Sequence, residues 1–127
     1  MSDLNSLHNR FVWVDIPVKD LDRAQKFYAE VLAIPVHKDQ FGDYQFCVLD
    51  HHDGNGGCLV PTDGEISGSG PLVYLNVNNR IRDAVARTEA SGGAIITPVE
   101  SIGPHGYRAV IRDSEGNRIA LHSTSNT

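Results

Sequence analysis

The chain has 127 residues, of which 40% are hydrophobic and 21% are charged, and its formal net charge is −5. This length fits a single domain that can form a hydrophobic core without disulfides or a structural metal. Because the balance is acidic and the basic residues are scattered, we do not expect nucleic-acid binding. No apolar run reaches the roughly 20 residues that span a bilayer, so no membrane segment is expected.

Residues 1–10 lack the apolar centre of a signal peptide, and the cytoplasm is the expected location. The two cysteines, Cys47 and Cys58, both stand in apolar stretches. Reduced, buried thiols are therefore expected for both.

The first half of the chain predicts a strand, a helix and three shorter strands. Residues 11–18 alternate as a strand does, and Pro17 predicts that this strand lies at a sheet edge or ends there, because proline cannot donate to a ladder. Asp20 is expected to cap a helix over 21–32, which Pro35 prevents from continuing. The remaining strands are expected near 35–37, at 44–49 and at 57–60, followed by a linker over 61–71.

The second half predicts the same order. A strand is expected over 72–77, and Asn79 is expected to cap a helix that begins at Ile81 and ends before Gly92. Strands are then expected at 94–97, 107–112 and 118–122, with a turn over 113–117. The chain is therefore an internal repeat with a period near 60 residues, in which Val18 corresponds to Val77.

Each repeat is too small to bury both faces of its own sheet, so we expect the two units to complete each other. In this arrangement the helices cover the face that bears Val14, Ile16, Val73 and Leu75. The opposite face is then expected to line a concave ligand cavity, and it carries Trp13, Asp15, Tyr74 and Asn76.

Two runs resemble a known family. Val-Lys-Asp-Leu-Asp-Arg-Ala-Gln-Lys-Phe-Tyr-Ala-Glu-Val-Leu (18–32) is similar to the first-repeat signature of the vicinal-oxygen-chelate superfamily. Asp-Ser-Glu-Gly-Asn-Arg-Ile-Ala-Leu (113–121) resembles its closing turn and strand. That superfamily includes glyoxalase I, bleomycin-resistance proteins and extradiol dioxygenases.

The resemblance implies an α+β fold with two βαβββ modules that form an eight-stranded open, barrel-like mixed sheet around a concave cavity. We therefore expect one domain over 1–127, with modules over 8–62 and 72–123, and a homodimer. The superfamily usually also holds a divalent metal in the cavity.

The metal-ligand positions implied by the resemblance fall at Trp13, Leu72 and Ala120, with a fourth near Cys58. The first three side chains cannot ligate a metal, and a cysteine alone does not make a divalent-metal site. We therefore predict no metal and no other cofactor, unless non-standard ligands supply one.

The remaining candidates each have two interpretations. Asp15 is a general base or a cation-binding group, or it is bonded to the Tyr74 hydroxyl or the Trp13 indole. His122 shares the concave face with Ala120, or is an edge histidine bonded to the backbone. His105 stands in a glycine-flanked loop that either rims the pocket or forms a plain turn. The predicted ligand-binding set is Trp13, Asp15, Tyr74, Asn76, His105 and His122, and no catalytic residue is identified.

Three functions remain open. The favoured one is binding of a small organic molecule without the usual metal. The alternative is a metal-dependent glyoxalase-like lyase, isomerase or dioxygenase with relocated ligands such as His105 and His122. The third is a structural or regulatory homodimer whose cavity is filled by its own aromatic side chains.

Overall fold

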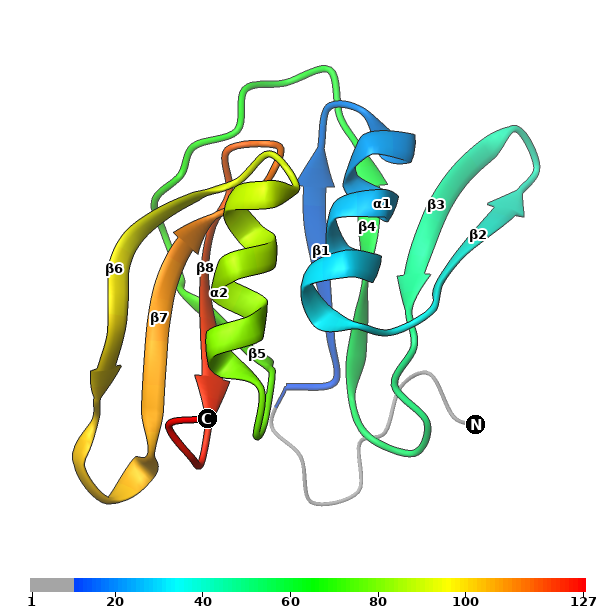
Figure 1. Cartoon of the computed structure of the whole chain (residues 1–127). Helices are drawn as coiled ribbons and strands as arrows, with labels where there is room; N and C mark the ends of the chain where they lie inside the picture. Colours follow the sequence, from blue (N-terminus) through cyan, green and yellow to red (C-terminus); the bar gives the residue numbers. More distant parts are fainter. Residues whose placement is uncertain (1–10) are drawn as a thin grey trace.

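The computed structural model describes residues 11–127 and confirms the repeat (Figure 1). The first unit contains β1 (Trp13–Val18), α1 (Leu21–Leu32), β2 (Val36–Phe41), β3 (Tyr44–Leu49) and β4 (Gly56–Pro61). The second contains β5 (Val73–Asn76), α2 (Ile81–Ala90), β6 (Ala94–Ser101), β7 (Tyr107–Arg112) and β8 (Arg118–Ser123). A short 3-10 turn, Gly103–His105, joins β6 to β7. The first three positions predicted for the first module, 8–10, lie outside the described residues.

The eight strands form two mixed sheets of four strands, in the orders β1-β4-β3-β2 and β5-β8-β7-β6. In each sheet the first strand runs parallel to the last one of its unit, and the other pairs are antiparallel. The predicted α+β fold is confirmed, with the strands divided between two sheets that do not close into a barrel. β1 is an edge strand, as Pro17 predicted.

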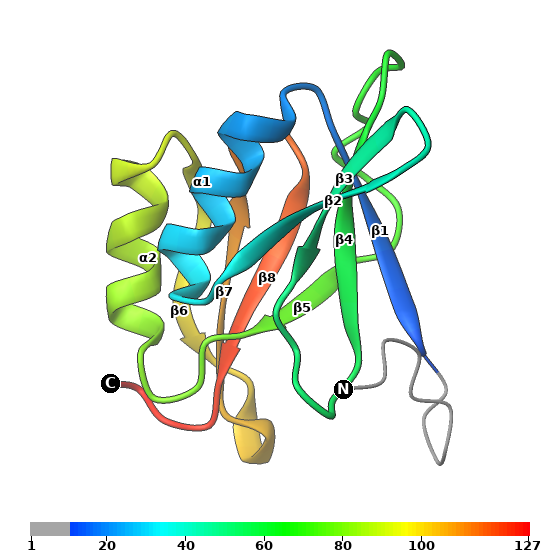
Figure 2. The same ribbon diagram turned by 90° about the vertical axis from the view of Figure 1, so that its right-hand side faces the viewer.

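Both helices lie on one side of the sheets (Figures 1 and 2). They bury a single core to which both units contribute, for example Phe27 of α1, Val18 of β1, Ile81 of α2 and Leu121 of β8. Cys47 and Cys58 are free and buried, as expected. None of the helices in residues 11–127 is long and apolar enough to cross a membrane.

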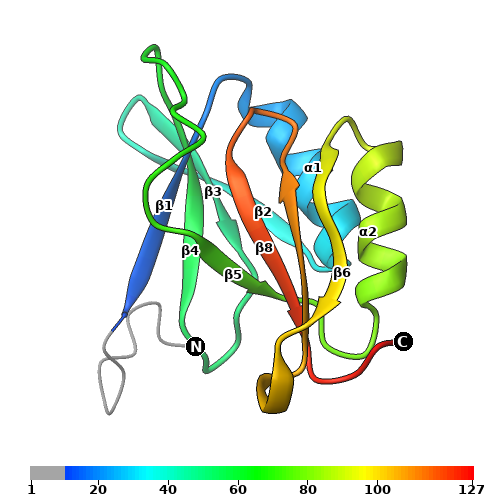
Figure 3. The ribbon, with the colours of Figure 1, turned by 90° about the vertical axis from the view of Figure 1, so that its left-hand side faces the viewer.

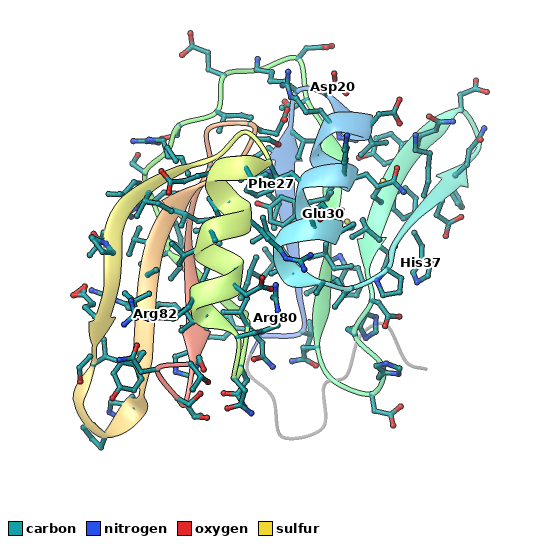
Figure 4. All side chains as sticks on the ribbon, in the orientation of Figure 1. Asp20, Phe27, Glu30, His37, Arg80 and Arg82 are labelled. Carbon is teal, nitrogen blue, oxygen red and sulfur yellow. The ribbon has the colours of Figure 1, made fainter. Side chains whose placement is uncertain are left out.

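The bounds of α1 follow from its sequence. The Asp20 carboxylate accepts a hydrogen bond from the backbone N–H of Arg23 at 3.0 Å, as an N-cap does. The helix ends at Leu32, and the next residue, Ala33, has a left-handed φ of 54°. Figure 4 shows Asp20 at the start of this helix and Phe27 further along it.

The cap predicted for α2 is wrong. The cap position is Arg80, and no side chain caps the helix there. Asn79 instead has a left-handed φ of 65°, which asparagine tolerates better than most residues. Its side-chain oxygen accepts a hydrogen bond from the Ser125 hydroxyl at 2.9 Å, so it serves the turn from β5 into α2.

The turn between β7 and β8 holds the start of α1. The buried Glu115 carboxylate accepts hydrogen bonds from the backbone N–H groups of Lys19 and Asp20 and an ion pair from Arg23 at 2.7 Å. Burial alone would raise the pKa of Glu115, but these bonds outweigh it and lower the pKa to about 2. The second unit therefore anchors a helix of the first.

Candidate functional site: a cleft between the sheets

A cleft lies between the two sheets, where β1 and β5 face each other as edge strands. No backbone ladder joins these two strands in residues 11–127. Two adjacent cavities of about 480 Å³ and about 800 Å³ occupy the cleft, within the range of small-molecule sites. The side chains that line both are largely apolar or aromatic: Phe11, Trp13, Val14, Ile16, Val73 and Tyr74.

Each cavity also has lining residues of its own. The smaller is bounded by Leu32 and Ile34 at the end of α1 and by the loop that carries His51 and His52. The larger is bounded by Asp15 of β1, by Arg118 of β8 and by residues 67–69 of the segment between β4 and β5. Figure 3 shows that this segment descends along the outer side of the sheets before it enters β5.

On the first sheet, Cys58 joins Trp13 to Asp15. The Trp13 indole N–H donates to the Cys58 sulfur at 3.4 Å, and the thiol donates to the Asp15 carboxylate at 3.1 Å. Burial raises the pKa of Cys58 to about 11, with the Trp13 bond lowering it and the Asp15 bond raising it. The thiol therefore stays protonated at neutral pH and holds both neighbours in place.

On the second sheet, Tyr74 lies among basic side chains. Arg108 donates to the Tyr74 hydroxyl at 2.5 Å, and the rings of Tyr74 and His122 are 6.5 Å apart in an edge contact. The His122 Nε2 lies 2.7 Å from the backbone carbonyl of His105. His122 thus contacts the backbone, as expected for an edge histidine. The carbonyl that it contacts belongs to His105, whose side chain is exposed.

The structure brings together four of the six predicted residues. Trp13 and Tyr74 line both cavities, Asp15 lines the larger one and Asn76 the smaller one. The side-chain oxygen of Asn76 also accepts a bond from the backbone of Asn78 at 2.8 Å. Two residues, His105 and His122, line neither cavity, because the turn at Gly103–His105 holds them at the end of β8.

The sequence did not predict the contribution of Arg118 or of residues 67–71. This stretch had the composition of a linker, and its course across the cleft depends on contacts distant in sequence. One of these is the bond from Arg118 to the Gly70 carbonyl at 3.0 Å. Strand alternation places Arg118 on the same face as Ala120, but gives no indication of what covers it.

The residues at the metal-ligand positions of the superfamily do not fit a divalent metal. Trp13, Leu72 and Ala120 offer no donor, and Cys58 keeps its proton and is engaged with Trp13 and Asp15. Among residues 11–127, no three His, Cys, Asp or Glu side chains are grouped so that they could hold a metal ion.

Comparisons with known proteins agree with this fold. A family model described as bleomycin resistance protein-like N-terminal matches residues 10–33. A glyoxylase-like domain-containing protein of Didymella fabae is 27% identical over 122 residues, which cover 91% of this chain and 94% of that protein.

Solved structures give the same result. A glyoxalase/bleomycin resistance protein from Albidiferax ferrireducens superposes with a TM-score of 0.72 at 19% identity, covering 91% of this chain and 98% of the other. A glyoxalase/bleomycin resistance protein/dioxygenase family enzyme from Burkholderia phytofirmans superposes with a TM-score of 0.70 at 20% identity, covering 88% and 96%. These matches show that the chain has the glyoxalase/bleomycin resistance fold, and they agree with the superfamily resemblance of its sequence.

Proposed function

We propose that the chain binds a small organic molecule, without a metal ion, in the cleft between β1 and β5. The observation that carries the proposal is the larger cavity of about 800 Å³, lined by Trp13 from one sheet and Tyr74 from the other. Aromatic side chains at an apolar cavity suit a flat, apolar ligand. Among the described residues, the Asp15 carboxylate accepts a hydrogen bond only from the Cys58 thiol, which is a weak donor, so it can also accept a bond from a ligand N–H or O–H.

The test uses 2-naphthamide, a flat neutral probe with an amide donor, in calorimetric titrations of protein dialysed against a chelator. The Tyr74→Ala variant should bind it about tenfold more weakly, because it loses a wall of the cleft. Tyr44→Ala is the matched control, since Tyr44 and Tyr74 are 46% and 47% exposed and only Tyr74 lines the cavities. An equal loss in both variants, or no binding by the unaltered protein, would count against the proposal.

The role of Asp15 has its own comparison. Asp15→Ala should weaken the binding of 2-naphthamide far more than His52→Ala, because the exposed His52 lines the smaller cavity and pairs with Asp50. Equal effects would remove Asp15 from the site. Elemental analysis of the purified protein tests the metal-dependent alternative. A content of about one metal ion per subunit would contradict metal-free binding and favour the metal-dependent alternative.

A further inference from the structure

Arg112 and Arg118 form an unusual pair on the second sheet. They are directly opposite partners on the neighbouring strands β7 and β8. Both point away from the helices, because the adjacent pair, Ile111 and Ile119, lies in the core. Like charges directly opposite each other destabilise a sheet, so this pair has a cost that the fold alone does not explain.

Neither guanidinium has a carboxylate partner within ion-pair distance in the described part of the chain. Most of the other described arginines do have one: Arg23, Arg80, Arg87 and Arg108. In contrast, Arg112 donates to the Gly116 carbonyl at 3.1 Å and Arg118 to the Gly70 carbonyl at 3.0 Å. The Nε of Arg118 is buried and has no hydrogen-bond partner. Two uncompensated positive charges thus stand together in a chain whose net charge is −5.

This pair lies at one end of the larger cavity. Arg118 lines that cavity beside Ser67 and Ser69, whose hydroxyl oxygens are 2.6 Å apart. Arg112 does not line the cavity but lies close to the same segment, since a Cβ added to Gly68 would lie only 2.6 Å from its Nη1. One guanidinium group and two hydroxyl groups therefore line one end of a largely apolar cavity, and a second guanidinium lies next to Gly68 of the same segment.

We infer that this end of the cleft is an anion subsite and that the ligand is an apolar molecule carrying a carboxylate. The carboxylate would be bound by Arg118, with Arg112 and the two serine hydroxyls beside it, while the apolar part lies against Trp13 and Tyr74. The planar guanidinium suits this group because its donors match both carboxylate oxygens. Asp15 lines the same cavity. Its negative charge repels a ligand carboxylate from the β1 wall and so favours binding of that carboxylate at Arg118. The inference rests on the proposed binding function and names its ligand class.

The test compares 2-naphthoate with 2-naphthamide, which has the same shape and no charge. Calorimetric titrations should show 2-naphthoate binding about tenfold more tightly to the unaltered protein. Arg118→Gln and Arg112→Gln should each remove most of that preference, so that the two compounds bind each variant with similar affinity. Arg82→Gln is the control, because Arg82 lies on α2 and bonds to Asn126, with no carboxylate partner in the described residues (Figure 4).

A second measurement guards against a misfolded variant. Removing one of two opposed positive charges should not lower the melting temperature of the ligand-free protein, so Arg112→Gln should be at least as stable as the unaltered chain. A preference for 2-naphthoate that persists in both variants, or no preference at all, overturns the anion subsite and leaves the binding function standing. If neither compound binds, the proposed function fails and the subsite fails with it.

Discussion

Cys58 acts beside the cleft as a hydrogen-bonding group for two residues that line it. Its thiol links the indole of Trp13 to the carboxylate of Asp15, which places an aromatic ring and an acceptor in one fixed arrangement. A thiolate would disturb this arrangement by placing a second negative charge beside Asp15. Burial keeps the proton on the sulfur. Cys58 is therefore a poor nucleophile, and its role is to position its two neighbours.

The first prediction concerns the reactivity of both thiols. Burial raises the pKa of Cys47 as well as that of Cys58, and both side chains are almost inaccessible. The native protein should therefore react very slowly with dithionitrobenzoate at pH 7.5, and the unfolded protein should release two equivalents at once. Rapid release of one equivalent from the native protein would show that one of the thiols is exposed.

Glu115 gives a prediction about pH. Its pKa falls from 4.5 to about 2 on folding, so its contribution to stability is complete above about pH 4.5 and is lost as the pH falls towards 2. Glu115→Gln should lower the free energy of unfolding at pH 7 by about 2 kcal/mol, because the buried donors lose a charged acceptor. Urea denaturation should show that the difference in unfolding free energy between the variant and the unaltered protein becomes smaller as the pH falls from 4.5 to 2. Glu89→Gln, an exposed change on α2, should show neither effect.

At the scale of elements, the pairing of β1 with β4 depends on a glycine. Val14 and Gly57 are opposite partners, and a Cβ at position 57 would lie 2.4 Å from the Val14 carbonyl oxygen. Backbone cannot yield as a flexible side chain would, so any larger residue must push the two strands apart. Because β1 is one wall of the cleft, this contact also sets the shape of the cavity.

Gly57→Ala should consequently destabilise the protein by about 2 kcal/mol, a typical cost of forcing extra volume into a packed site. It should also weaken the binding of 2-naphthamide, since β1 carries Trp13 and Asp15. Gly64→Ala provides the control, because the added Cβ would have only the Thr62 hydroxyl oxygen nearby, at 3.4 Å. Thermal melting of the two variants compares them directly, and equal midpoints would contradict the role given to Gly57.

The sequence was informative where local signals determine an element. The helix α1 was predicted from end to end, because Asp20 and its apolar spacing are local features. The strands β2 and β6 were predicted too short. β2 continues to Phe41 through its ladder with β3 although its later side chains are exposed, and register shifts interrupt the alternation of β6.

The same distinction applies to the site. Trp13, Asp15 and Tyr74 line one cavity, as alternation along β1 and β5 predicted. Val14, Ile16 and Val73, which alternation assigned to the opposite face, line it too, because the cleft lies between two edge strands that are not paired with each other. The positions of His105 and His122 depend on a turn whose shape no pattern encodes. Arg118 could not be assigned to the site because its neighbour in the cavity is a segment about 50 residues earlier in the chain.

At the scale of the whole molecule, the hairpin of β2 and β3 exposes an aromatic surface. Phe41 is 82% exposed and Tyr44 is 46% exposed, and the Tyr44 ring stacks on Phe46 with 5.8 Å between centroids. Exposed apolar side chains that lie together are typical of protein–protein contact surfaces. We therefore propose that this face contributes to a homodimer, the association that the superfamily resemblance implies.

Light scattering at micromolar concentration should accordingly give twice the mass of one chain. Replacing Phe41 with Asp should shift the protein towards the monomer, because a charge would have to be desolvated at the contact. Replacing the exposed Ile96 of β6, which is 44% exposed and lies on the other sheet, serves as the control. A monomeric mass for the unaltered protein would contradict the dimer.

The contacts that hold α1 also determine what the connecting segment has to do. Glu115 binds the beginning of α1, and Arg80 donates to the Val31 carbonyl near its end at 2.8 Å, so the second unit holds the helix at both ends. In these contacts, side chains of the second unit bind backbone groups at the two ends of α1, and the segment over residues 62–72 takes no part in them. Besides the bond of its Gly70 carbonyl to Arg118, the segment raises the effective concentration of one unit around the other. The same contacts can form between units of different chains once the protein concentration approaches this effective concentration. Refolding at high protein concentration should therefore produce domain-swapped dimers, in which the first unit of each chain packs against the second unit of the other.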